Sequence, residues 1–220
     1  MKVIQEYKYI TTLSSVDALH HLIKLTDHFL TFKDCEKNKK LKYTKDFLHL
    51  KQYLDLDTNQ DLHNIVYDAE EPIRNKLLKN ISILSSYYNQ YNTRKYHILT
   101  DIDDTIIPHP SPYHSIQGSD HSDVKGLPYS GIIEFYKQLP NTFTDYRTIL
   151  TGTPRIFKKS RRTKYEYILG PHAFLNGYDE FSKSLGSIDM SRGRLSTNPD
   201  KVAYIKLERL LQYKLLFPEY

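Results

Sequence analysis

The feature that most constrains this chain is a hydrophobic run that ends in three aspartates, "HILTDIDDTIIP", at residues 97–108. Its first residues are apolar or β-branched, which favours a buried strand. Asp101, Asp103 and Asp104 follow directly. Carboxylates this close together repel one another and are costly to bury, so a cation is expected beside them. The stretch therefore predicts a strand that brings carboxylates to a functional site.

A helix and a second strand are predicted after these aspartates. The strand is "YRTILTG" at residues 146–152. The helix lies within "PYSGIIEFYKQLP", and its expected apolar side consists of Ile132, Ile133, Phe135, Tyr136 and Leu139. Strand, helix and strand in this order indicate a βαβ unit with parallel strands and a right-handed crossover. Because ligands bind beyond the carboxyl ends of such strands, Asp101 and Thr151 are expected to converge.

The preceding part of the chain is predicted to be helical. Ser14 or Ser15 is the expected N-cap of a helix whose apolar face contains Val16, Leu19, Ile23 and Leu30. A lysine-rich break at residues 33–42 is expected to separate it from the next helix, and Pro72 should start or kink a third. We therefore predict two domains: a helical N-terminal region at 1–95 and a second domain at 96–220.

Composition limits the classes of protein to which the chain can belong. Its 220 residues include 26% charged and 39% hydrophobic side chains, which suits a globular protein. No apolar run approaches the roughly 18 residues of a membrane span, and the N-terminus has no signal-peptide pattern. Cys35 is the single cysteine, so no internal disulfide can form. The expected location is the cytoplasm, or that of a host cell if the source is a virus.

Clustered carboxylates at a strand end suit phosphoryl transfer. One carboxylate can attack phosphorus, while a second protonates the leaving group and later activates water. Asp101 and Asp103 have a spacing that lets both face one pocket. Mg²⁺ prefers carboxylate oxygens and would neutralise the phosphoryl group. Thr151 and the backbone N–H of Gly152 could hold a phosphoryl oxygen, and a lysine could neutralise the remaining charge.

Four stretches in order carry a family resemblance: "DIDDTII", "PYSGIIEFYKQL", "ILTGTPR" and the closing "KLERLLQYKLLFPEY". Together they resemble the haloacid dehalogenase superfamily, and more narrowly the catalytic domain of the actin-patch type phosphatidate phosphatases. The resemblance covers roughly residues 96–220. It implies an α/β fold class, with a partial Rossmann-like parallel sheet of the haloacid dehalogenase type beside the N-terminal helical region.

The resemblance assigns roles by position. It makes Asp101 the nucleophile and Asp103 the general acid and base, with both as Mg²⁺ ligands. Thr151 matches the family's second-motif hydroxyl, and Thr105 and Gly152 would bind phosphate. The motif lysine is best matched by Lys206 on the last helix, which Asn198 and Pro199 should begin, with Lys201 as the weaker candidate. Asp104 is expected to support the site rather than ligate the metal.

The family's fourth motif, which supplies a further metal carboxylate, would follow Tyr220, so the resemblance implies a domain that is incomplete at its C-terminal side. The strand carrying that motif would lie beside the Asp101 strand, and its absence would leave an open edge that a partner chain could complete. The alternative to an active phosphatase is therefore a catalytically inactive remnant or split-gene product that acts, if at all, as an interaction module.

The expected activity is Mg²⁺-dependent hydrolysis of a phosphomonoester through an aspartyl-phosphate, with phosphatidate as one candidate. The expected partner is accordingly a phosphorylated small molecule or lipid headgroup. A basic stretch at residues 154–164 and the net charge of +5 suit such anions. No nucleic-acid-binding motif accompanies the stretch, so a nucleic-acid partner is not favoured from the sequence.

Overall fold

A computed structural model describes residues 2–31, 36–56, 62–91, 97–101, 104–108, 127–138, 146–154, 185–188 and 199–220. The chain divides into two compact units. Met1–Lys95 and Gln212–Tyr220 form one, called here the helical unit, and Tyr96–Leu211 form the other, called the strand unit. The division after Lys95 lies where the sequence placed it. Residues Gln212–Tyr220, however, belong with the N-terminal helices and not with the predicted second domain.

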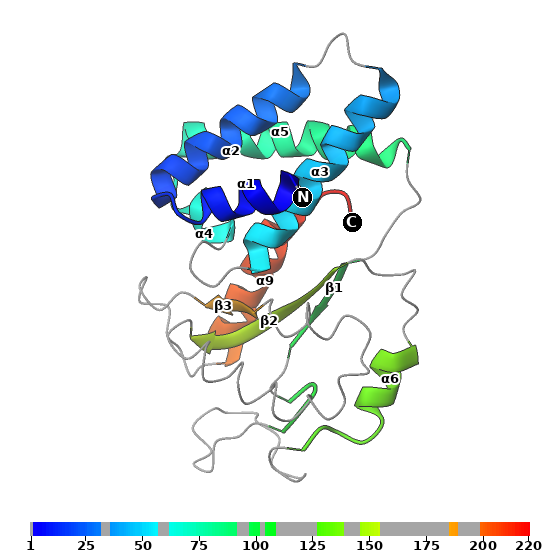
Figure 1. Cartoon of the computed structure of the whole chain (residues 1–220). Coiled ribbons are helices and arrows are strands. Elements are labelled where there is room, and N and C mark those ends of the chain that lie inside the picture. Colours follow the sequence, from blue (N-terminus) through cyan, green and yellow to red (C-terminus); the bar gives the residue numbers. More distant parts are fainter. Residues whose placement is uncertain are drawn as a thin grey trace. The chain divides into compact units, whose positions relative to one another are not determined.

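The described part of the helical unit consists of α1 (Lys2–Ile10), α2 (Ser15–Leu30), α3 (Lys37–Leu56), α4 (Leu62–Tyr67), α5 (Glu71–Asn89) and the end of α9 (Pro199–Leu216) (Figure 1). α2 packs against α5, and α3 packs against both α1 and α5. The side chains at the centre of this packing are at most 1% exposed; they include Leu22, Phe47, Leu54, Leu77 and Leu84. Burying one such side chain stabilises the fold by about 1.5–3 kcal/mol.

Local signals begin the helices as the sequence predicted. Ser14 is the N-cap of α2, and its hydroxyl oxygen accepts a hydrogen bond from the backbone N–H of Asp17 at 3.2 Å. Pro72 lies at the start of α5, where its missing N–H costs no helical hydrogen bond, so it starts this helix rather than kinking it. Pro199 is likewise the first residue of α9. Asn198, the predicted cap of that helix, is outside the described residues.

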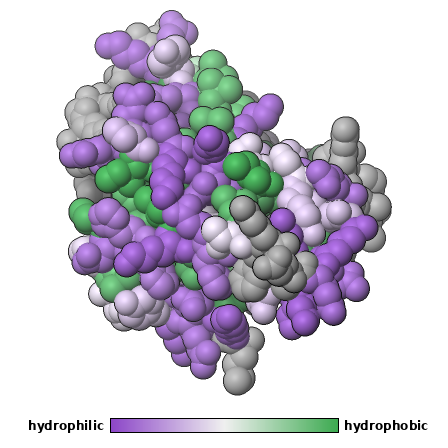
Figure 2. All heavy atoms as spheres, turned by 90° about the horizontal axis from the view of Figure 1, so that it is seen from above, coloured by the Kyte–Doolittle hydropathy of each residue, from purple (hydrophilic) through white to green (hydrophobic). Residues whose placement is uncertain are grey.

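Two predictions about the helices are wrong. The lysine-rich stretch is not a break throughout, because α3 begins at Lys37 and its first two turns carry most of the lysines. Val16 does not belong to the buried face of α2, since it is 64% exposed, whereas Leu19 on the same helix is buried. Isolated exposed apolar residues are ordinary on protein surfaces. The face seen from above in Figure 2 agrees, because hydrophobic residues form separate areas on a mainly hydrophilic surface.

The strand unit contains β1 (His97–Thr100), α6 (Ile132–Gln138), β2 (Tyr146–Pro154) and β3 (Leu185–Ile188), followed by the first part of α9. The described strands run parallel in the order β1-β2-β3. The predicted pairing of the two strands that flank the α6 region is confirmed, with His97 opposite Tyr146 and Thr100 opposite Ile149. Phe135 does not lie on a buried side of α6, because it is 57% exposed.

The fold class predicted from the sequence is nevertheless wrong. Of the residues whose backbone and side chains are both described, 76% are helical, and a Rossmann-like sheet is not present among them. The described strands have only 4, 9 and 4 residues. The prediction failed because it classified the chain by its strand–helix–strand segment, whereas the larger described part consists of helices that pack on one another. The described part of the chain is predominantly helical and carries a short set of parallel strands.

Candidate functional site

Asp101 follows β1 directly, so the strand delivers its carboxylate to the carboxyl end of the short sheet. The preceding residue, Thr100, is buried, and its hydroxyl donates a hydrogen bond to the backbone carbonyl of Asp101 at 3.1 Å. The side chain of Asp101 keeps 23% of its surface exposed. The hydrogen bond thus holds the backbone of Asp101, while its carboxylate remains partly exposed and can be reached by a small ion.

Lys206 on α9 contacts this carboxylate. Its Nζ donates to Oδ2 of Asp101, and the two residues are 105 positions apart in the sequence. The lysine side chain is 28% exposed, so the ion pair is partly accessible to solvent. The structure thus joins the predicted nucleophile to the predicted motif lysine. The weaker candidate, Lys201, is exposed in the first turn of the same helix.

Thr151 and Gly152 lie on β2, the strand next to β1. Thr100, the residue before Asp101, is opposite Ile149 in the parallel register, and Thr151 is two positions after Ile149 on β2. The two predicted residues therefore reach the same edge of the sheet as Asp101. β2 differs from the prediction in one respect: it continues to Pro154, so Thr151 is not at its end.

The turn after the aspartates is held by backbone hydrogen bonds. Asp104 has a φ of 57°, a left-handed conformation that Asp and Asn adopt more readily than other side chains. Its N–H donates to the carbonyl of Ile107 at 2.7 Å, and the N–H of Tyr129 donates to the carbonyl of Ile106 at 2.9 Å. Ile106 and Ile107 are buried, while Asp104 and Thr105 are exposed. Thr105 is thus presented at the surface of a turn whose following residues are anchored.

The predicted metal site is described only in part. Asp101 supplies one hard carboxylate oxygen ligand of the kind that Mg²⁺ prefers, whereas Asp103 is outside the described residues. Within the described ranges, no three His, Cys, Asp or Glu side chains come together in a group that could hold a metal ion. The donor type at Asp101 fits Mg²⁺, and completing the ligand set would need groups such as Asp103. The basic stretch after Pro154 also lies outside the described residues.

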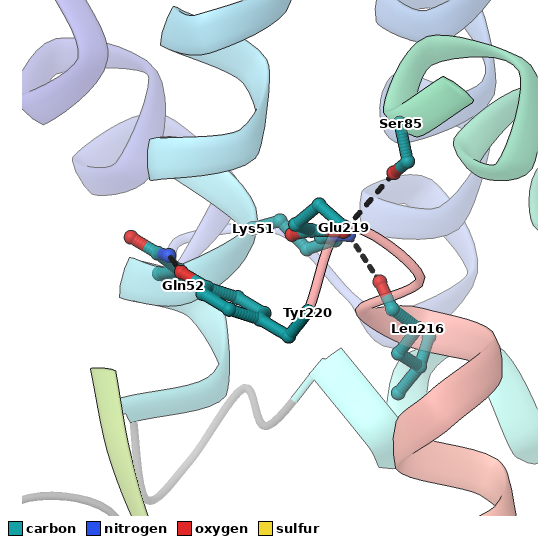
Figure 3. A network of polar contacts seen from close by, with 6 residues as sticks. All are labelled: Lys51, Gln52, Ser85, Leu216, Glu219 and Tyr220. Atoms are coloured by element: carbon teal, nitrogen blue, oxygen red, sulfur yellow. Dashed lines mark hydrogen bonds and ion pairs between the residues drawn. The ribbon is translucent and has the colours of Figure 1, made fainter. Parts of the chain in front are cut away.

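A second polar cluster, which the sequence analysis missed, lies within the helical unit (Figure 3). Lys51 on α3 is 1% exposed, and its Nζ donates to the carbonyl of Leu216 and to Oε2 of Glu219, the latter at 2.9 Å. The hydroxyl of Ser85 on α5 donates to the same oxygen at 3.0 Å. We call Lys51, Ser85 and Glu219 the buried triad.

The C-terminal segment makes further contacts beside the buried triad. The Lys51 ammonium lies 4.7 Å from the ring centroid of Phe217, a cation–π contact. The amide of Gln52 donates to the hydroxyl of Tyr220. The lysine and its acid partner are 168 positions apart, so no spacing pattern could have revealed the pair. The available signal was a lysine within a run rich in large apolar side chains, "FLHLKQYL".

His63 on α4 also contacts the end of α9. Its Nε2 pairs with Oε1 of Gln212, and its ring stacks on Tyr67 with centroids 4.8 Å apart. The Tyr67 hydroxyl donates to the backbone carbonyl of Gln212 at 3.3 Å. Burial raises the pKa of Tyr67 to about 12, because the ionised phenol would lose its hydration. This cluster joins α4 to the C-terminal segment.

Comparisons with protein-family models, with curated proteins and with solved structures found no match to this chain. Among the residues that the structure describes, no helix combines the length and the apolar character needed to cross a membrane. Function therefore has to be argued from the side chains that the fold brings together, above all from the pair of Asp101 and Lys206.

Proposed function

We propose that this chain is a Mg²⁺-dependent phosphatase-like protein that hydrolyses a phosphomonoester through an aspartyl-phosphate. The observation that supports the proposal most directly is the contact between Asp101 and Lys206, since a carboxylate and a lysine from distant parts of the chain meet at a strand end. The substrate class is a phosphorylated small molecule or a lipid headgroup such as that of phosphatidate. The single cysteine suits a reducing compartment, so the cytoplasm is the proposed location.

The reaction proceeds in two displacements. In the first, an oxygen of Asp101 attacks phosphorus, the bond to the leaving alkoxide breaks, and Asp103 gives its proton to that alkoxide. In the second, Asp103 takes a proton from water, whose oxygen attacks phosphorus and releases inorganic phosphate with a regenerated carboxylate. Bound Mg²⁺ would neutralise phosphoryl oxygens during both displacements.

Lys206 has a distinct task in this scheme. Without substrate, its ammonium neutralises the Asp101 carboxylate. When the phosphoryl group arrives, the same ammonium can contact a phosphoryl oxygen, which places positive charge where negative charge develops in the transition state. Thr151 and Gly152 belong to the adjacent strand β2, and the threonine hydroxyl and the glycine N–H would hold a further oxygen. Among the described strands β1 has one neighbour, β2, so the strand of the expected partner chain would pair along its other side.

Phosphate release from p-nitrophenyl phosphate, measured with and without Mg²⁺, tests the proposal. Asp101→Asn should abolish turnover, because the amide cannot act as the nucleophile. Lys206→Gln should lower kcat by about a hundredfold, as expected for losing one donor to a developing charge. Lys201→Gln is the matched control on the same helix and should change kcat less than about twofold, a surface effect.

The activity of an Asp104 variant and the metal dependence of turnover test the phosphatase proposal further. Asp104→Asn should keep most of the activity, because asparagine tolerates the left-handed backbone of that residue equally well. If the purified chain shows no turnover with Mg²⁺, Mn²⁺ or Co²⁺, the phosphatase proposal is wrong for this chain. The alternative, a catalytically inactive interaction module, would then be the better description.

A further inference from the structure

The start of α3 carries a dense positive charge. Lys37, Lys39, Lys40, Lys42 and Lys45 fall within its first three turns, and the first turn contains no acidic residue. A helix N-terminus is itself the positive end of the helix dipole, so cations there destabilise the helix. Positions where a sequence departs from such a local rule are often functional.

Tyrosines from the end of α5 lie beside these lysines. The Lys37 ammonium is 4.4 Å from the ring centroid of Tyr91, and that of Lys40 is 4.8 Å from the ring centroid of Tyr87. The two rings contact each other edge to face, with centroids 5.3 Å apart. The Tyr87 hydroxyl also donates to the backbone carbonyl of Lys37 at 3.4 Å. Figure 1 shows the beginning of α3 and the end of α5 at the same end of the helical unit.

Two of the lysines are fully available to a partner. Lys42 and Lys45 are exposed. Thr44, which lies between them, and Phe47, which follows, are buried. Within the described part of the chain, neither lysine forms an ion pair with a carboxylate. Glu36, directly before α3, pairs with Lys39 at 3.7 Å, and both side chains are more than 60% exposed. An exposed pair of this kind adds little stability and cancels little of the surrounding charge.

We propose that the start of α3 and the end of α5 bind single-stranded nucleic acid. Bases would contact the cluster of Lys37, Lys40, Tyr87 and Tyr91, and phosphates would contact Lys42 and Lys45 on other sides of the same turns of α3. Lysines neutralise successive phosphates, and aromatic rings offer platforms on which bases stack without regard to sequence. Tyr91 suits this role because 38% of its surface is exposed next to the Lys37 ammonium. This combination is not visible in the sequence, because the tyrosines are about 50 residues from the lysines and only the fold brings the two groups together.

The observations favour nucleic acid over an anionic bilayer. The rings that border the lysines are tyrosines, which bring polar hydroxyls to the surface. Stable attachment to a bilayer needs inserted apolar side chains or a lipid in addition to a basic patch. Basic side chains and aromatic rings are the combination that single-strand binders use.

Fluorescence anisotropy of the full chain with a labelled oligothymidine of about 16 nucleotides, titrated between about 50 and 200 mM salt, tests the proposal. The double variant Lys42→Gln/Lys45→Gln should weaken binding at least about tenfold at the lower salt. It should also reduce the slope of log K against log salt by about 1.4, because each lost phosphate contact removes about 0.7. Tyr91→Leu should weaken binding at least about fivefold and leave the slope unchanged, since stacking releases no counterion.

The matched control is Lys24→Gln/Lys79→Gln, which removes two exposed charges from α2 and α5 outside the proposed binding region. It should leave both affinity and slope within about twofold of the parent chain, and all variants should keep the parent's circular dichroism. Equal losses in the two double variants would overturn the proposal, because they would show a response to net charge only. So would duplex binding as tight as single-strand binding, binding to phosphatidylserine vesicles without oligonucleotide binding, or no binding to either. Asp101→Asn should bind the oligonucleotide normally, which separates this proposal from the phosphatase.

Discussion

Two lysine–carboxylate pairs, one in each unit, use the same chemistry in different surroundings. Lys51 and Glu219 in the helical unit have side chains that are 1% and 4% exposed, and they are joined at 2.9 Å. Lys206 and Asp101 in the strand unit have side chains that are 28% and 23% exposed. Both pairs link residues more than 100 positions apart. The degree of burial is what separates them.

Burial determines what each pair can do. Charges removed from water must keep their partners, because an unpaired buried charge is expensive. Lys51 and Glu219 are therefore committed to each other, and they hold the C-terminal segment on the helices. A partly exposed pair can exchange its partner for solvent or for a ligand at low cost. The partly exposed pair of Lys206 and Asp101 can therefore accept an anion, as the proposed phosphatase activity requires.

The largest effect is expected from Lys51→Met. Removing the ammonium leaves the Glu219 carboxylate buried without its cation, so the free energy of unfolding should fall by about 3–5 kcal/mol. Urea denaturation at neutral pH would measure the loss. The double variant Lys51→Met/Glu219→Leu is the control, and it should recover much of the loss because an apolar pair needs no charge compensation. A loss below about 1 kcal/mol in the single variant would show that the pair is accessible to water.

A much smaller effect on stability is expected from Lys206→Gln. Its pair is partly exposed, so the free energy of unfolding should change by about 1 kcal/mol or less in the same denaturation experiment. The variant should nevertheless lose most of the proposed phosphatase activity. If Lys206→Gln lowered the free energy of unfolding as much as Lys51→Met, the difference in burial between the two pairs would have no effect. Lys206 would then be a structural residue.

The smallest effect should come from the exposed pair that joins α2 and α5. Hydrogen bonds from Lys76 and Asn80 hold the pKa of Asp27 below its ordinary value of 3.8, with burial opposing them. Because the folded-state pKa is lowered, the stabilisation is complete above the unfolded value and disappears as the pH falls through the folded one. Asp27→Asn should lower stability by a few tenths of a kcal/mol at pH 7, since the pair is exposed.

Thermal melting checks this pH dependence. The difference in Tm between the parent chain and Asp27→Asn should shrink from pH 7 to about pH 3. Lys76→Gln should reproduce the same difference, and the double variant should be no less stable than either single one if the two side chains act on each other. A Tm difference that stays constant between the two pH values would mean that the carboxylate's charge is not what stabilises the contact.

The sequence predicted those parts of the fold whose causes are local. Ser14 caps α2 through a residue three positions away, and Pro72 and Pro199 start helices through their own geometry. The start of α3 at Lys37 was not predicted, because a cluster of lysines is typical of a linker. The tyrosine rings of α5 that contact Lys37 and Lys40 are distant in the sequence. The prediction of the fold class was wrong because it gave too much weight to local strand signals. Strand signals are conspicuous in a sequence, but the proportion of helix depends on packing across the whole chain.

The residues of the candidate site that belong to a sequence motif could be chosen from the sequence. Asp101 was singled out by its place after an apolar strand, and the family resemblance chose Lys206 before the structure placed it on that carboxylate. The buried triad could not be predicted in this way. Each of its members is common in helices and tails, and their relation exists only after the chain has folded.

The bond from Lys51 to the carbonyl of Leu216 also bears on how α9 ends. Leu216 is the last residue of that helix, and the final carbonyls of a helix have no partner within it. Many helices solve this with a glycine just beyond their end, but here Phe217 and Pro218 follow. A cation from a different helix takes the glycine's place and lies at the negative end of the α9 dipole. Pro218 prevents α9 from continuing, and Lys51 on α3 satisfies a carbonyl of its last turn, so a change at Lys51 would loosen a helical turn whose own sequence is intact.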